Sequence, residues 1–155
     1  MLARSVGATL LVALASTVQH DATAAAAGLA SSDPEARTKA ACALREMGRD
    51  AAPALPRLAA LLADGSPVDA AVCGERTWRF HGMREANALT SPGEQAASAM
   101  VAIGSPSFAP FSQALAGPAW IARRNAAWGL GALDASEAVP ALVEALKDTE
   151  AGVRE

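Results

Sequence analysis

The chain contains few of the residues that normally build β-sheets. It has no tyrosine, and aromatic residues make up only 4% of its 155 positions. Sheet-rich cores depend on aromatic and β-branched side chains, whereas helices can pack closely through small ones. Alanine occupies 41 positions and hydrophobic residues make up 52% of the chain. We therefore predict a folded, all-α protein.

Cysteine, histidine and positive charge are also scarce. The chain has two cysteines and two histidines, with no C-x-x-C pair and no glycine-rich phosphate loop. Metal sites, catalytic triads and nucleotide-binding loops need such residues, so we predict no metal site, no cofactor and no catalytic residue. The net charge of −3 and the pI near 5.4 argue against a nucleic-acid-binding protein.

The N-terminus resembles a secretion signal. A short basic start, residues 1–4, precedes an apolar run over residues 6–18, and Ala22-Thr23-Ala24 supplies small residues for cleavage. We predict that residues 1–24 are a signal peptide and that the protein is exported, periplasmic or extracellular. The alternative is a capping helix in a cytoplasmic protein. No other apolar run approaches the roughly 18 residues of a membrane span, so we predict no integral membrane contact.

An internal repeat organises the rest of the chain. The stretches RTKAACALREMG, GEQAASAMVAIG and RRNAAWGLGALD align without gaps when they end at Gly48, Gly104 and Asp134. Each has residues at i, i+3, i+4 and i+7, the spacing of one helix face. These residues are Ala40, Ala43, Leu44 and Met47; Ala96, Ala99, Met100 and Ile103; and Ala126, Gly129, Leu130 and Leu133. The first two residues of each set are small, which would let a neighbouring helix approach closely.

A second, shorter helix follows each stretch. Apolar triplets at spacing three and four mark these helices: Leu55, Leu58 and Leu62; Phe108, Phe111 and Leu115; and Val139, Leu142 and Leu146. We predict an α-α superhelix of about three helical hairpins, spanning residues 25–155, with a loop insertion at residues 65–90 between the first and second complete hairpins. The sequence from Asp148 begins another first helix, so we expect the last repeat to be truncated.

The repeat resembles a known family. Asp-Pro-Glu-Ala-Arg37 leads into Ala-Ala-Cys-Ala-Leu44, and Val-Pro-Ala-Leu-Val-Glu-Ala-Leu146 precedes Lys-Asp148. This pattern is similar to HEAT repeats, especially the bacterial HEAT-like or phycobilisome-lyase-like branch. The resemblance implies a right-handed superhelix with first helices outside and second helices on the concave side. It departs from the family pattern in the insertion and at Gly93, where neighbouring repeats have arginine.

Family members mostly bind other proteins, and a minority attach or detach bilin chromophores. We therefore predict a non-catalytic scaffold that binds another protein through its concave face and the inserted loop. The candidate binding residues are Arg57, Gln113 and Glu144 on the second helices, and Arg76, Trp78, Arg79, Phe80, His81 and Arg84 in the basic, aromatic loop. The alternatives are a bilin-type lyase or accessory module, and a structural segment of a longer exported protein.

Two further interpretations concern the insertion. Its aromatic residues could instead cover the hydrophobic edge between two hairpins. Cys73 in the insertion and Cys42 in the first alanine-rich stretch are compatible with one disulfide if the chain is exported, or with two inert thiols in a reducing compartment. A disulfide closing a loop of about 30 residues would stabilise the fold by roughly 3–4 kcal/mol.

Overall fold

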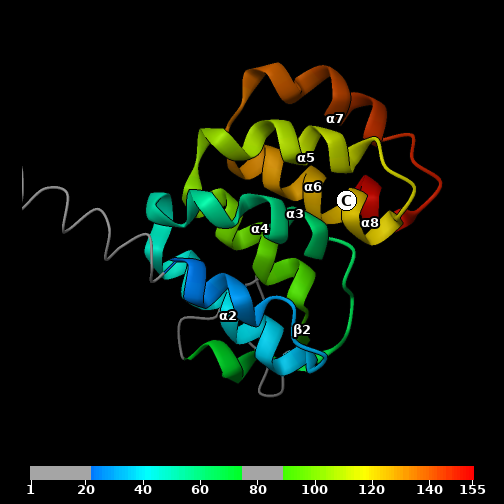
Figure 1. Cartoon of the computed structure of the whole chain (residues 1–155). Coiled ribbons are helices and arrows are strands. Elements are labelled where there is room, and N and C mark those ends of the chain that lie inside the picture. The colour runs from blue at the N-terminus through cyan, green and yellow to red at the C-terminus, as the bar shows by residue number, and fades with distance from the viewer. Residues whose placement is uncertain (1–21, 75–88) are drawn as a thin grey trace, which may run out of the picture.

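The computed structural model describes residues 22–74 and 89–155, and its helices form two rows (Figure 1). The first-helix row contains α2 (Pro34–Met47), α4 (Pro92–Ile103), α6 (Trp120–Ala132) and α8 (Ala151–Arg154). The second-helix row contains a helix at residues 22–28, α3 (Leu55–Leu61), α5 (Phe108–Leu115) and α7 (Val139–Ala145). Short 3-10 turns η1 (Gly48–Ala54), η3 (Ser105–Ser107) and η4 (Ser136–Ala138) connect the two rows.

Neighbouring hairpins lie side by side rather than around a common centre. In the first-helix row α2 packs on α4, α4 on α6 and α6 on α8; in the second-helix row α3 packs on α5 and α5 on α7. Each element thus contacts the equivalent element of the next hairpin, which is the packing of a solenoid. The predicted all-α, HEAT-like solenoid is confirmed.

Small side chains set the distance between the rows. Ala96, Ala97 and Ala99 of α4 are completely buried, so the surrounding helices approach its backbone closely. At Gly129 of α6 even a methyl group would overlap the ring of Phe111 in α5. Close packing at these alanine-rich faces therefore depends on the absence of larger side chains.

The prediction that one residue of the first helices is buried is wrong. Ala43 was expected to face the core with its equivalents in α4 and α6, but it is exposed. The preceding helix at residues 22–28 is short and packs where Gly28 meets Ala40. No described helix therefore covers Ala43. The buried residues in and just after that preceding helix are Ala22, Ala26 and Leu29.

The three aligned stretches each end at a residue with a positive φ. Gly48, Gly104 and Asp134 have φ of +58°, +93° and +51°. Glycine adopts a positive φ without a steric penalty, whereas aspartate does so at some cost. Immediately before each second helix lies one small buried residue, Ala54, Ser107 or Ala138.

Recurring arginines fasten the hairpins. The Arg37 Nε donates to the Asp64 carboxylate at 2.7 Å, and the Arg123 Nε donates to the Asp148 carboxylate at 2.7 Å. Each pair joins the start of a first helix to the turn after the following second helix. Burial acts to raise the pKa of Asp64, but hydrogen bonds from Ser66 and Arg37 outweigh it, so this pKa lies below its usual value.

The inserted segment contains more structure than the loop we expected. Strands β1 (Val68–Asp69) and β2 (Leu89–Thr90) pair antiparallel, with Val68 opposite Thr90, and a 3-10 turn, η2 (Ala70–Cys73), follows β1. A disulfide joins Cys73 to Cys42 of α2, with 5.8 Å between their Cα atoms. The start of the insertion is thus attached to the first-helix row.

Candidate protein-binding surface

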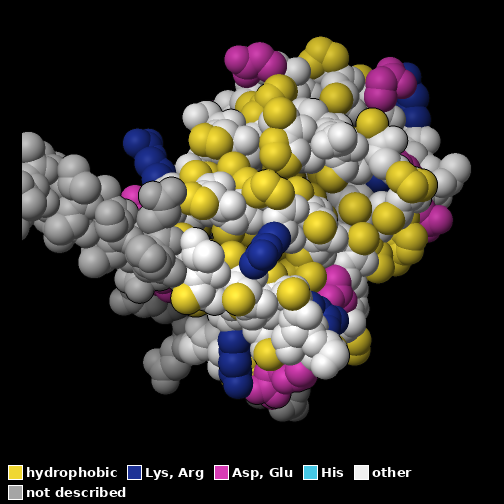
Figure 2. All heavy atoms as spheres, viewed as in Figure 1, with side chains coloured by type: hydrophobic (Ala, Val, Ile, Leu, Met, Phe, Trp, Pro, Cys, Tyr) yellow, Lys and Arg dark blue, Asp and Glu magenta, His cyan; other side chains and the backbone are white. Residues whose placement is uncertain are grey.

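The second-helix row presents an apolar face. Hydrophobic side chains gather over α3, α5 and α7, while acidic and basic side chains lie mostly towards the outline of this face (Figure 2). Three predicted binding residues lie here: Arg57 on α3, Gln113 on α5 and Glu144 on α7 are all exposed. The structure therefore places these three side chains on successive second helices, where a bound segment of another protein could reach them.

A groove runs between α5 and α7. It has a volume of about 300 Å³, at the lower end of the range for ligand sites. Its lining is mostly small or apolar: Ser112, Leu115, Ala116, Ala141, Glu144, Ala145 and Asp148. Glu144 is the predicted residue that borders the groove. Because alanines form much of the lining, apolar side chains of a partner could enter without displacing long side chains.

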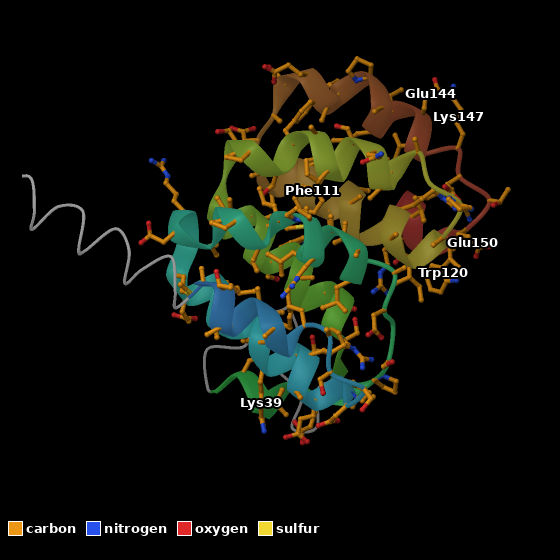
Figure 3. The ribbon with its side chains drawn as sticks, viewed as in Figure 1. Lys39, Phe111, Trp120, Glu144, Lys147 and Glu150 are labelled. Carbon is orange, nitrogen blue, oxygen red and sulfur yellow. A yellow bond between two sulfur atoms is a disulfide. The ribbon has the colours of Figure 1, made fainter. Side chains whose placement is uncertain are left out.

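The two carboxylates of the groove are already paired with cations. The Lys147 Nζ lies 2.9 Å from the Glu144 carboxylate, and both side chains are exposed at the end of α7 (Figure 3). Hydrogen bonds from Arg123, reinforced by the Glu150 backbone N–H, lower the pKa of Asp148 to about 2. The groove is therefore close to electrically neutral near pH 7, which favours an apolar occupant over a cation.

Arg57 differs from these paired charges. It is exposed on α3, and no hydrogen bond or ion pair joins it to another described residue. An unpaired, solvated guanidinium keeps all its donors available for a carboxylate on a partner. The second-helix face thus combines an apolar groove at one end with a free cation near the other.

The remaining predicted residues cannot be placed on this surface. Arg76, Trp78, Arg79, Phe80, His81 and Arg84 fall within residues 75–88, outside the described residues. The predicted signal peptide lies almost wholly in residues 1–21, which are also outside them. Both interpretations stay predictions, as do the lyase and structural-segment alternatives.

Sequence reasoning missed most of the groove lining. Ser112, Leu115, Ala141 and Ala145 come together only because α5 and α7 turn particular faces towards each other. A signal was present, since residues 141, 145 and 148 follow the i, i+4, i+7 spacing of one helix face. In an alanine-rich chain this spacing is too common to single out a surface.

The described residues also bear on two other kinds of site. Among residues 22–74 and 89–155, no cluster of three or more histidine, cysteine, aspartate or glutamate side chains is placed to hold a metal ion. Within the same ranges no helix is long and apolar enough to cross a membrane.

Comparison with known proteins identifies the repeat. The family model for HEAT repeats matches residues 108–155, which contain α5 to α8. No curated protein matches the sequence closely enough to be compared with it. HEAT repeats generally mediate protein–protein interactions and are generally non-catalytic. The match covers the C-terminal part of the chain. The upstream hairpins repeat its helix order and the positive φ at the end of the first helix, and the hairpin of α2 and α3 repeats its arginine–aspartate pair. Residues 108–155 are therefore similar to HEAT repeats, and the upstream hairpins have the same architecture.

Proposed function

We propose that this protein is a non-catalytic scaffold that holds a segment of another protein against the second-helix row. The observation that carries this proposal is the groove between α5 and α7, because it is open, neutral and lined by small side chains. Helical or extended segments commonly bind such grooves through apolar anchors. Arg57 would then bind an acidic residue of the same partner segment.

The proposal extends to the inserted loop. Its arginines and aromatic residues, Arg76, Trp78, Arg79, Phe80, His81 and Arg84, are of types enriched at interface hot spots. The disulfide holds the beginning of the insertion on α2. Ordering one end of a loop lowers the entropy lost when the loop binds, which supports a role in recognition.

We further propose that the protein acts in an oxidising compartment outside the cytoplasm. The pairing of its two cysteines in a disulfide supports this location, since such bonds persist mainly in exported proteins. The basic and apolar residues at the N-terminus support it independently.

Site-specific photo-crosslinking would test the scaffold. A photoreactive amino acid at Gln113 should capture a discrete partner in the host, whereas one at Ala132, exposed at the end of α6 in the other row, should not. Ala141→Arg, which fills the groove, should abolish the Gln113 product. Ala132→Arg is the matched control, because it adds the same side chain at another exposed alanine of the same hairpin.

Two results would oppose this proposal. Equal capture from Gln113 and Ala132 would mean that the second-helix row has no special affinity for proteins. A Gln113 product that survives Ala141→Arg would show that the groove is not used. A visible absorbance band in the purified protein would instead favour the bilin-related alternative.

A further inference from the structure

Residues 68–73, here called the strap, lie against the side of α2 (Figure 1). The strap consists of β1 and η2, and its last residue, Cys73, forms the disulfide with Cys42 of α2. The main hydrophobic core extends from Ala26 to Ala138 along the chain, yet it contains no strap residue. The strap is therefore attached to the solenoid without being part of its interior.

Apart from the disulfide, few interactions hold the strap in place. Val68 and Ala70 are buried, whereas Asp69 and Ala71 are exposed. The pairing of β1 with β2 covers two residues only, and isolated two-stranded ribbons are at best marginally stable. Ordering six residues of backbone costs conformational entropy that opposes these small gains. The disulfide is therefore the main link between the strap and α2.

The strand that pairs with the strap is itself firmly held. Thr90 of β2 accepts a hydrogen bond from the Gln95 Nε2 at 2.9 Å and donates one to the Glu94 carboxylate at 3.2 Å. The next residue, Ser91, caps the N-terminus of α4. Because β2 is fixed to the start of α4, loss of the disulfide should free β1 and η2 but leave β2 and the helices in place.

The surroundings of Cys42 suit a thiol as well as a disulfide. The Cys42 Sγ lies 3.4 Å from the Gln95 Oε1, and the Arg45 Nη1 donates to the same oxygen at 2.9 Å. A reduced Cys42 could donate its S–H to Gln95, a hydrogen bond that the disulfide cannot make. The neighbouring Arg45 guanidinium would stabilise a Cys42 thiolate. Arg45 also pairs with Glu46, but the Glu46 side chain is 66% exposed, so solvent screens its charge.

From these contacts we propose that the disulfide between Cys42 and Cys73 is a redox switch, which a protein dithiol opens to release the strap from α2. A thiolate of the dithiol attacks the Sγ of Cys73, which is less buried than Cys42. The bond between the two cysteine sulfurs breaks, and its electron pair leaves with the Cys42 Sγ, which takes a proton from solvent. The second thiol of the dithiol then displaces Cys73, which leaves as a thiol. The chain thus gains two thiols, and the dithiol is oxidised to a disulfide.

Opening the switch changes the surface of the first-helix row. In the oxidised protein the strap covers the side of α2 that carries Cys42, and in the reduced protein this side becomes accessible. In an oxidising compartment the closed form is the resting state, and a protein dithiol supplies the two electrons that open it. The groove between α5 and α7 belongs to the other row, so the proposal does not depend on the proposed function.

Reduction of the folded protein would test the switch. Dithiothreitol, and then a reduced protein dithiol, should reduce the bond without denaturant, as measured by alkylation and mass spectrometry, while circular dichroism retains the helical signal. Backbone amides of residues 68–74 should then exchange with deuterium at least about tenfold faster, whereas those of α4 and α5 should change little. Cys73→Ser should show the fast exchange without any reductant. Since Cys73 is only half-buried, this variant should fold.

The rate of reduction would test the role of Arg45. Arg45→Gln should slow the reaction with dithiothreitol roughly threefold or more, because the leaving thiolate loses its neighbouring cation. Arg49→Gln is the matched control, since it removes the same charge from an exposed residue after the end of α2, and it should leave the rate unchanged.

Four results would overturn the proposal. The bond could be reducible only in denaturant, the helices could unfold as the bond opens, or residues 68–74 could exchange at the same rate in both redox states. Equal reduction rates for Arg45→Gln and Arg49→Gln would refute the assignment of Cys42 as the leaving group. The crosslinking from Gln113 would be unaffected by any of these results, so the two proposals can fail separately.

Discussion

The contact between Gly129 of α6 and Phe111 of α5 offers the sharpest test of how the two rows pack. Both residues are buried, and a Cβ added at Gly129 would overlap the Phe111 ring. We predict that Gly129→Ala destabilises the protein. Phe111, on α5 (Figure 3), is completely buried, so its ring has little room to move away from an added methyl group.

The magnitude follows from two opposing terms. Overpacking a well-filled core by one methyl group costs about 1–3 kcal/mol. Replacing glycine by alanine within a helix gains up to about 1 kcal/mol in helix propensity. Gly131 separates these terms, because it lies in the same helix and nothing is within 4 Å of a Cβ added there. Gly131→Ala should therefore be neutral or stabilising, and Gly129→Ala should be less stable than it by about 1–3 kcal/mol.

Urea denaturation followed by far-ultraviolet circular dichroism would measure both free energies of unfolding. Combining Gly129→Ala with Phe111→Leu should recover part of the loss relative to the sum of the single changes, since the smaller side chain makes room for the methyl group. If Gly129→Ala proved as stable as Gly131→Ala, the close approach of α5 to α6 at this point would be refuted.

Three further predictions concern charge, backbone and redox state. Because the pKa of Asp148 is lowered from 3.8 to about 2, its pairing with Arg123 should stabilise the fold above pH 4 and lose this effect as the pH falls towards 2. The difference in melting temperature between wild type and Asp148→Asn should shrink over that interval, and a constant difference would contradict us. Asp134→Gly should stabilise the protein by about 1 kcal/mol, because it relieves a φ of +51°; a loss in urea titrations would exclude strain there. Reducing the disulfide between Cys42 and Cys73 should cost about 3–4 kcal/mol, and two free thiols in unreduced, denatured, exported protein would show that the bond does not form.

The interior of the fold could be predicted from the sequence because the repeat constrains it. Leu58 and Phe111 occupy the same place in successive second helices, and both are completely buried. The ends of the aligned stretches, at Gly48, Gly104 and Asp134, each have a positive φ. Hydrophobic periodicity predicts the buried face of a helix, and helix-ending residues predict where the helix stops. These two signals were sufficient to predict the interior.

The surfaces were harder to predict because they depend on how whole helices are placed. The groove requires particular faces of α5 and α7 to meet, and the exposure of Ala43 follows from the short helix that precedes α2. Strands of two residues, such as β1 and β2, leave almost no pattern in a sequence. The small buried residue before each second helix, Ser107 for example, is hidden among many other small residues.

The one repeat that lacks the fastening arginine shows how far the interior can vary. Gly93 stands where the other units have Arg37 and Arg123, and Gly117, two residues after Leu115, stands where they have an aspartate. The two partners are missing together, as expected because either charge alone would be partly buried without compensation. The Gly93 backbone N–H instead donates to the Asp64 carbonyl at 2.9 Å, and a Cβ there would lie 2.8 Å from that oxygen.

The start of a first helix is thus held to the linker before it in one of two ways. Either an arginine side chain donates to carbonyl oxygens of the linker, or a backbone amide donates directly to one of these oxygens. Solenoid packing needs only that the start of each first helix be fastened to the linker before it, so different residues can meet the requirement. The partner cannot be predicted by comparing repeats, because each unit exposes different side chains on the second-helix row. This is why a repeat compared with itself can establish the architecture, whereas the partner has to be identified by crosslinking.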